Sequence, residues 1–284
     1  MLLATGLLSD TGCAFAEDQD TALFAPFARV LDMHVQEYPL TGGGLVSSFD
    51  YRAAQADIET MRLIDQQRVR LAEFDPERIE SRQQALAFWI NAYNFFMIAH
   101  ILEHPGDGKL VDSVRDYGSL FNPYRVFDRN LFDIGGRHYA LSEIEIDVLL
   151  GEEFAARGWK DARVHFAVNC ASVGCPPLRE KAYNAETVDG MLDENTRLAL
   201  NTPLHLHIEE DTLWLSSLFD WYQSDFAEQS GSVREFIGEH VNKSTRQRIK
   251  QATQTRFIDY DWDLNGPDNI RAWIEARNLE QPDP

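Results

Sequence analysis

One segment of the sequence is apolar on nearly all sides, and it constrains the fold more than any other. This segment covers residues 85–102. Ser81 and Gln84 form a capping-box pattern just before it, and Pro105 and Gly106 follow it, which predicts a helix between these signals. A helix without a polar face must be enclosed by other elements. We therefore expect a buried central helix with the rest of the chain packed around it.

The composition restricts the kind of molecule that can surround this helix. The 284 residues are 44% hydrophobic and carry a formal net charge of −20, which is spread along the chain. Such a hydrophobic content supports a folded core, whereas the excess of carboxylates repels nucleic-acid phosphates and anionic lipids. No stretch approaches the roughly 20 apolar residues of a membrane-spanning helix. We expect an acidic globular protein with no nucleic-acid partner and no integral membrane segment after signal cleavage.

The N-terminus indicates export. Residues 1–8 are mostly apolar, Ala14, Phe15 and Ala16 fit the small-x-small pattern of a cleavage site, and a strongly polar stretch follows. We therefore predict a signal peptide over residues 1–16 and a periplasmic or secreted location. Of the three cysteines, the mature chain would keep Cys170 and Cys175, in a compartment that favours oxidation.

The remaining segments change irregularly between helix and strand patterns. Periodicity and capping signals predict helices over residues 22–34, 50–74, 142–150, 184–200 and 216–226, from 232 onward and near 268–276. Alternation and turn signals predict strands over residues 131–134, 137–141, 163–169, 204–208 and 212–215. Irregular clustering of this kind favours an α+β fold over a wound parallel sheet.

Cys170 is the first candidate for chemistry, because it ends the predicted strand 163–169 and opens a loop of small residues. A thiol becomes a good nucleophile when a nearby histidine favours its thiolate form. His165 lies on the same predicted strand, although strict alternation puts it on the opposite face. Two other interpretations stay open. Cys170 and Cys175 could form a disulfide that stabilises the fold by roughly 2 kcal/mol, or they could be an inert buried pair.

Other polar residues also have two interpretations each. Glu145 could orient a histidine, but Ser142 and Glu145 also fit a capping box in which Glu145 bonds back to its own helix. Asn91 and Asn94 share one face of the central helix. Because buried amides need partners, they either tie this helix to loops or line a pocket as substrate or oxyanion donors.

No set of residues predicts a metal or a cofactor. His205 and His207 share one strand face without an evident third ligand, and the acidic stretch 259–263 lacks the closing glutamate of a calcium loop. The spacing of Cys170 and Cys175 fits neither a CxxC redox motif nor a zinc knuckle.

Five segments in order resemble the domain-of-unknown-function 547 family; they are residues 87–94, 141–145, 164–178, 219–226 and 260–265. The resemblance runs from about residue 47 to 265. It implies a division into a helical N-terminal extension over residues 17–46, the family domain over 47–265 and a C-terminal helix over 266–284.

The resemblance implies a papain-like core, similar to that of cysteine peptidases, with an antiparallel sheet, the buried central helix and an added N-terminal helical layer. It also implies that Cys170 is the nucleophile, His165 the base and Glu145 the acid that orients the base. Ile146 departs from the family pattern, which usually has histidine at this place.

Chemistry and resemblance together predict an exported thiol-dependent hydrolase or acyltransferase that acts on peptide amide or thioester bonds. The expected substrate is a peptide or a small thiol peptide. The expected substrate contacts are Asn91, Trp89, Asn94, Ser172 and Trp221. The alternative is a non-catalytic periplasmic binding or scaffold domain in which Cys170 and Cys175 form a structural disulfide.

Overall fold

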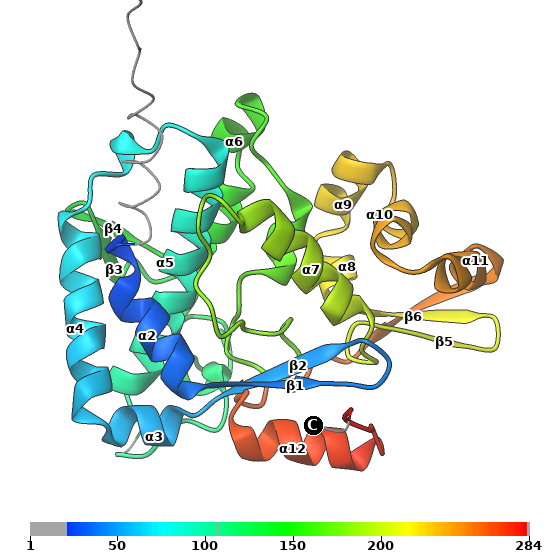
Figure 1. The fold of residues 1–284 in the computed structure, drawn as a ribbon, viewed down its shortest axis with the longest axis horizontal. Helices are drawn as coiled ribbons and strands as arrows, with labels where there is room; N and C mark the ends of the chain where they lie inside the picture. The colour runs from blue at the N-terminus through cyan, green and yellow to red at the C-terminus, as the bar shows by residue number, and fades with distance from the viewer. Residues whose placement is uncertain (1–21, 107, 283–284) are drawn as a thin grey trace, which may run out of the picture.

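The long helix α5 (Arg82–Glu103) forms the centre of the fold in the computed structural model, which describes residues 22–106 and 108–282 (Figure 1). Ser81 Oγ accepts a hydrogen bond from the Gln84 backbone N–H, and the Gln84 side chain accepts one from the Ser81 N–H, so the capping box is present. All residues from 85 to 102 are buried. The prediction of a buried central helix is confirmed.

By length and composition, α5 could also cross a membrane, so the expectation that no stretch approaches this length was wrong. It is the one helix of this kind among the described residues, and its apolar window is entirely buried inside the structure.

The N-terminal layer contains a β-hairpin in addition to helices. Its elements are α2 (Ala25–His34), β1 (Val35–Pro39), β2 (Leu45–Phe49), α3 (Tyr51–Ala56), α4 (Ile58–Glu73) and η1 (Pro76–Arg78). The expected extension over residues 17–46 is therefore not purely helical. The helix expected over residues 50–74 is divided at Asp57, whose extended backbone and carboxylate cap the start of α4. The predicted signal peptide over residues 1–16 lies outside the described residues.

The strands form small separate sheets. The short hairpin of β3 (Phe132–Ile134) and β4 (Arg137–Tyr139) is antiparallel, as is the pairing of β5 (Leu206–Glu209) with β6 (Thr212–Ser216), so both predicted hairpins are confirmed. Strand β7 (Gln254–Ile258) then adds to β6 in parallel. The expected antiparallel sheet is therefore present only in part, because β7 pairs in parallel, whereas the coarser α+β prediction is confirmed.

The other helical segments surround α5 and the three-stranded sheet. They are η2 (Val114–Tyr117), the π-helix η3 (Glu143–Leu149), α6 (Glu152–Ala156), the 3₁₀-helix η4 (Ala162–Phe166), α7 (Val188–Leu200), α8 (Leu218–Trp221), α9 (Gln223–Ser230), α10 (Val233–His240), α11 (Lys243–Gln251) and α12 (Pro267–Ala276). In Figure 1, α8–α11 and the β5–β6 hairpin lie on the opposite side of α7 from α2 and α4.

The predicted strand over residues 163–169 is wrong, because this segment begins as η4 and continues as a loop. The Asp161 side chain accepts a hydrogen bond from the Arg163 N–H and caps the 3₁₀ turn. Val164, His165 and Phe166 are all buried, so the alternating pattern did not separate an inner from an outer face.

Helix η4 lies between two hydrophobic clusters. Val164 packs into the main cluster around α5, whereas Phe166 packs with Phe219, Phe226 and Phe236 in a second cluster beside the three-stranded sheet. His165, which lies between Val164 and Phe166, is therefore placed at the junction of these two clusters.

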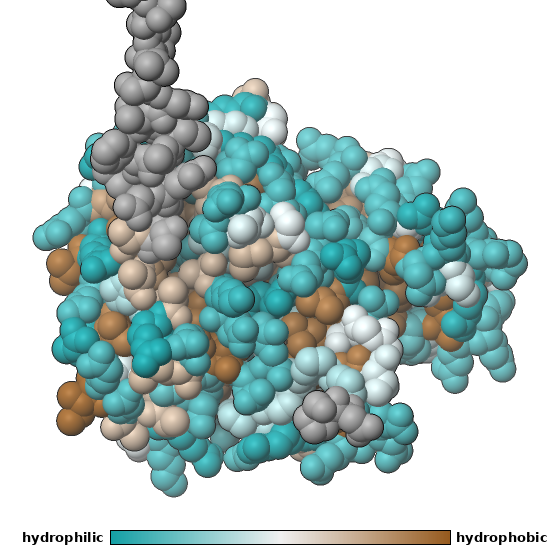
Figure 2. Space-filling view, viewed as in Figure 1, coloured by the Kyte–Doolittle hydropathy of each residue, from teal (hydrophilic) through white to brown (hydrophobic). Residues whose placement is uncertain are grey.

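The molecular face in Figure 2 is mostly hydrophilic, with small separate hydrophobic patches.

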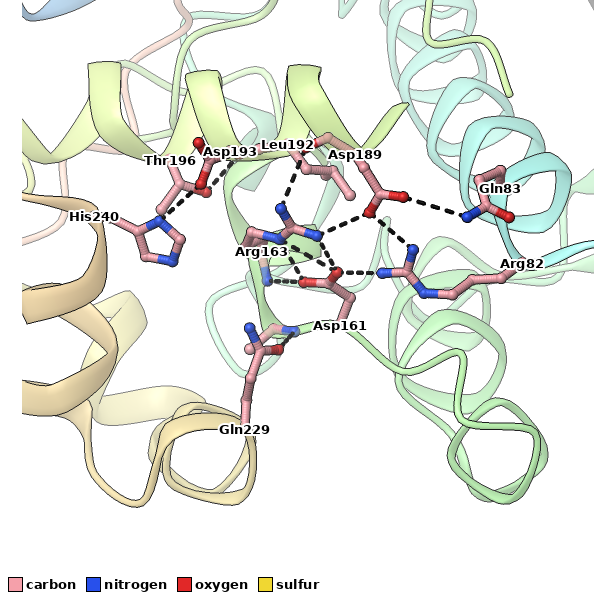
Figure 3. Close-up of polar contacts among 11 residues, drawn as sticks. Arg82, Gln83, Asp161, Arg163, Asp189, Leu192, Asp193, Thr196, Gln229 and His240 are labelled. Carbon is pink, nitrogen blue, oxygen red and sulfur yellow. Dashed lines mark hydrogen bonds and ion pairs between the residues drawn. The ribbon is translucent and has the colours of Figure 1, made fainter. Parts of the chain in front are cut away.

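A cluster of ion pairs fixes the start of η4 (Figure 3). The Arg82 guanidinium contacts Asp161 at 2.5 Å and Asp189 at 2.8 Å, and Arg163 contacts the same two carboxylates at 2.7 and 3.0 Å. Burial alone would raise the pKa of Asp189, but the hydrogen bond from Arg82 lowers it below its usual value. The cluster joins α5, η4 and α7, and so holds the segment that carries His165.

Candidate functional site

A cavity of about 370 Å³ opens where α5, η3, η4 and α8 meet. Its wall includes the three predicted catalytic residues, Glu145, His165 and Cys170. The rest of the lining is largely aromatic and includes Tyr93, Tyr124, Trp221, Tyr222, Tyr260 and Trp262. A pocket of this size and lining is suited to a small organic molecule or a short peptide segment.

The His165 ring is held between two carboxylates. Its Nδ1 lies 3.3 Å from Glu145 Oε1, and its Nε2 lies 2.9 Å from Asp225 Oδ2. Because ionised carboxylates only accept hydrogen bonds, each ring nitrogen must carry a proton to donate. Burial alone would lower the pKa of His165, but the hydrogen bonds to Asp225 and Glu145 raise it above its ordinary value. The geometry therefore fits a buried imidazolium, whose ring also stacks on Tyr222 at 3.9 Å between centroids.

Asp225 continues this arrangement into a row of alternating charges. Its carboxylate contacts Lys160 Nζ at 2.9 Å, and Lys160 contacts Glu228 at 2.6 Å. Burial tends to raise the pKa of Asp225, but the hydrogen bonds from His165 and Lys160 lower it below its usual value. Asp225 was not among the sequence candidates. Its presence in the segment 219–226, which supported the family resemblance, was the available signal.

Cys170 and Cys175 form a disulfide. The sequence left this pairing open, and the structure has it in place of a free thiol at Cys170. The hydroxyl of Tyr260 lies 3.2 Å from Cys170 Sγ and 3.3 Å from Cys175 Sγ. Because burial raises the pKa of Tyr260 well above its ordinary value, this hydroxyl keeps its proton and acts as a donor.

The predicted dyad of Cys170 and His165 is not formed. Among the hydrogen bonds of the described residues none joins these two side chains, because both ring nitrogens of His165 are bonded to carboxylates. Ala171, with a positive φ of 65°, turns the chain at the loop that carries the two bonded cysteines. The predicted pairing of His165 with Glu145 is present.

The alternative interpretation of Glu145, as a capping residue, is wrong. Ser142 makes no side-chain cap, and its hydroxyl donates instead to the Phe127 carbonyl. Glu145 is buried within the π-helix η3, where its carboxylate faces the cavity and His165. Residues 143–149 were expected to form an ordinary helix, and π-helical turns often occur at functional sites.

Residues 76–198 match the family model described as "Protein of unknown function, DUF547". This segment belongs to the DUF547 family. No curated protein and no solved structure matches the chain. The DUF547 match includes Glu145, His165 and both cysteines, whereas Asp225 and Tyr260 follow it in the sequence.

Two predicted substrate contacts on α5 of the DUF547 segment have structural partners instead. Asn91 donates to the Tyr183 carbonyl at 2.7 Å and accepts from its N–H at 2.9 Å. Asn94 donates to the Ala167 carbonyl at 2.9 Å and accepts from the Asn169 N–H at 2.8 Å. Because their amide groups are bonded to backbone, both residues tie α5 to loops, as their alternative interpretation proposed.

Of the remaining predicted substrate contacts, Trp221 lines the cavity, whereas Trp89 and Ser172 do not. Trp221 lines the cavity and packs against Tyr260 and Trp262, with ring centroids 5.0 and 5.9 Å apart. Trp89 packs against Tyr139 and lines a different pocket. Ser172 is buried outside the cavity lining, although its backbone N–H donates to Cys175 Sγ.

The sequence analysis did not identify the tyrosines that line the cavity. Tyr93, Tyr222 and Tyr260 all belong to segments that supported the DUF547 resemblance, but no local pattern distinguished them from core residues. Within residues 22–106 and 108–282, no group of three or more His, Cys, Asp or Glu side chains could hold a metal ion.

Proposed function

We propose that the protein is an exported thiol-dependent acyltransferase or hydrolase, active in its dithiol form, in which Cys170 attacks a carbonyl of a ligand bound in the aromatic cavity. The observation that carries this proposal is that the Cys170 sulfur shares one cavity with the buried pair of Glu145 and His165. Only the thiolate form of a cysteine is a strong nucleophile.

His165 has a different role here from the base that the resemblance implied. Held between Glu145 and Asp225, it is a fixed cation whose charge offsets that of the two carboxylates, and it has no free nitrogen to accept the Cys170 proton. The Tyr260 hydroxyl, which lies 3.2 Å from Cys170 Sγ, donates to this sulfur. The thiol proton of Cys170 passes to solvent, since this residue is partly exposed.

This electrostatic arrangement favours thioesters over amides. When the thiolate of Cys170 attacks a thioester, the leaving group is itself a thiolate with a conjugate pKa of about 8.5, and it leaves without a proton. An amine must be protonated as it leaves, and the His165 protons are already engaged by two carboxylates. The acyl group then passes from Cys170 to water or to another nucleophile.

The papain-like core and the periplasmic or secreted location belong to the same proposal. The buried helix α5 beside the cavity supports the papain-like core, although the mixed sheet differs from the expected antiparallel one. A disulfide between Cys170 and Cys175 is in keeping with an oxidising compartment.

A second candidate is a non-catalytic binding or scaffold domain. The disulfide favours it, because a bonded Cys170 cannot act as a nucleophile. In this case the aromatic cavity would bind its ligand without chemistry, and Cys170 and Cys175 would only stabilise the loop between them.

The test compares the oxidised and the phosphine-reduced protein with an acyl thioester and with the matching amide. We expect thioester cleavage only after reduction, loss of activity in Cys170→Ser, and retained activity in Cys175→Ser. Activity that is the same in Cys170→Ser would overturn the role of Cys170, and a reduced wild type that binds the thioester but never turns it over would favour the binding domain instead.

A further inference from the structure

The two sulfurs of the disulfide lie in different environments. Both cysteines line the cavity, but Cys170 is partly exposed, whereas Cys175 is buried, with 6% of its surface exposed. Cys175 Sγ accepts hydrogen bonds from the backbone N–H of Cys170 at 3.1 Å and of Ser172 at 3.3 Å. The Tyr260 hydroxyl lies 3.3 Å from the same sulfur and 3.2 Å from Cys170 Sγ, so its one proton is shared between the two sulfurs. Two backbone donors therefore converge on Cys175 alone, and the tyrosine adds a third, shared donor.

The backbone conformation at Ala171 accounts for this convergence. Its φ of 65° lies in the left-handed region, where non-glycine residues are uncommon. The N–H groups of Cys170 and Ser172, on either side of Ala171, both reach Cys175 Sγ. A concave arrangement of backbone N–H groups stabilises an anion. A sulfur with this set of donors is suited to carry the negative charge of a thiolate.

From this asymmetry we propose that the Cys170–Cys175 disulfide is reactive and exchanges with a low-molecular-weight thiol that enters the cavity. The thiolate of the ligand attacks Cys170 Sγ, the bond between the two protein sulfurs breaks, and Cys175 leaves as a thiolate. A second thiol attacks the ligand sulfur of the mixed disulfide, so that a ligand disulfide forms and Cys170 is released as a thiolate. Two electrons pass from the two thiols to the protein, and the thiol protons go to solvent or to the cysteines.

The direction of attack follows from access and from the leaving group. Both cysteines line the cavity, but a thiol there meets the more exposed Cys170 more readily than the buried Cys175. Thiol exchange is faster when the leaving sulfur is the more stable thiolate, and hydrogen bonds to the charged form stabilise it. Both effects select Cys170 as the sulfur that is attacked. The exchange does not require the acyl chemistry proposed above.

The experiment follows the oxidised full chain with 2-mercaptoethanol as the thiol probe. Samples are quenched with acid, alkylated with N-ethylmaleimide and examined by intact mass and peptide mapping. We expect an intermediate with the mercaptoethanol group on Cys170 and the maleimide on Cys175. A mercaptoethanol group found on Cys175, or a disulfide that stays closed at thiol concentrations that open ordinary exposed disulfides, would overturn the proposal.

Two variants separate this role of Tyr260 from a merely structural one. Tyr260→Phe removes one donor to the leaving sulfur, and we expect the opening rate to fall about fivefold, the effect of one ordinary hydrogen bond. Tyr38→Phe, at a tyrosine bonded to Ser48 outside the cavity, should open at the wild-type rate. Equal rates in both variants would contradict the role of Tyr260.

Thiol exchange and acyl chemistry can fail independently. If thiols open the disulfide but the reduced protein cleaves no thioester, the exchange stands and the proposed function falls. If the disulfide resists thiols but the phosphine-reduced protein cleaves thioesters, the proposed function stands and the thiol exchange is wrong.

Discussion

His165 Nε2 lies 2.9 Å from Asp225 Oδ2, although the two residues are 60 positions apart in the sequence. A base that is oriented by Glu145 needs its other ring nitrogen free for Cys170, and the contact with Asp225 occupies that nitrogen. Since Glu145 occupies the other nitrogen, the chemistry of the cavity depends on an imidazolium that is fixed between two carboxylates. The first two predictions test this relationship.

Asp225→Asn should lower both the pKa of His165 and the stability of the fold. Asparagine keeps a hydrogen-bond acceptor near Nε2 but removes the negative charge that favours the imidazolium. We expect the free energy of unfolding to fall by about 2 kcal/mol, because a buried cation loses part of its compensation. Urea denaturation and an NMR titration of the His165 ring measure the two effects. Asp220→Asn, at an exposed position on α8, is the control and should change neither quantity.

The stability contributed by His165 should depend on pH in a defined direction. Its folded pKa is raised above the ordinary value of 6.5, so the native state binds more protons than the unfolded state in this window. The contribution is fully present below pH 6.5 and is lost as the pH rises through the folded pKa. Urea denaturation of wild type and His165→Gln from pH 6 to 9 should show a difference that shrinks as the pH rises. A constant difference would argue against the imidazolium.

Reduction of the disulfide should destabilise the fold modestly. The loop between Cys170 and Cys175 is short, with a sequence separation of 5. Its closure lowers the entropy of the unfolded chain and so stabilises the fold by about 2 kcal/mol. We expect this loss in urea denaturation when phosphine is added to the wild type. The double variant Cys170→Ala and Cys175→Ala should be insensitive to phosphine. A wild type that is equally stable in both states would show that the disulfide has no structural role.

The ion-pair cluster at the start of η4 should be essential for stability. Asp161 is 5% exposed at its side chain and pairs with Arg82 and Arg163. Asp161→Asn leaves two guanidinium groups short of a buried carboxylate, and we expect a loss of about 3 kcal/mol. Glu153→Gln, in an exposed pair with Arg157, should cost little. Similar thermal denaturation midpoints for the two variants would contradict this difference.

Trp221 should contribute to ligand binding at the cavity. Trp221→Ala removes an aromatic wall, and we expect KM for an acyl thioester to rise about tenfold with kcat changed less, since an aromatic contact away from the reacting atoms acts on binding. Trp214→Ala, on β6 outside the cavity lining, should keep KM unchanged. A rise in KM of the same size in both variants would indicate general loosening of the fold.

The elements that the sequence predicted correctly depend on interactions between close neighbours. The capping box of Ser81 and Gln84, the apolar segment that became α5 and the two hairpins all arise from contacts within a few residues or from simple periodicity. The same reasoning failed for residues 163–169, because η4 lies between two hydrophobic clusters and is buried on both sides. Where a segment is buried on both sides, the alternation of its side chains does not indicate which of them point to the core.

The sequence by itself determined that the chain would enclose α5, and it identified the two segments that carry Glu145 and, further along, His165 and the two cysteines. Only the tertiary structure decided the partners of these side chains. Asp225 reaches His165, and Tyr260 reaches both sulfurs, from segments 60 and 90 positions away. The physical reason is that a charge or a hydroxyl finds its partner through the packing of whole elements, which no spacing of neighbouring residues records.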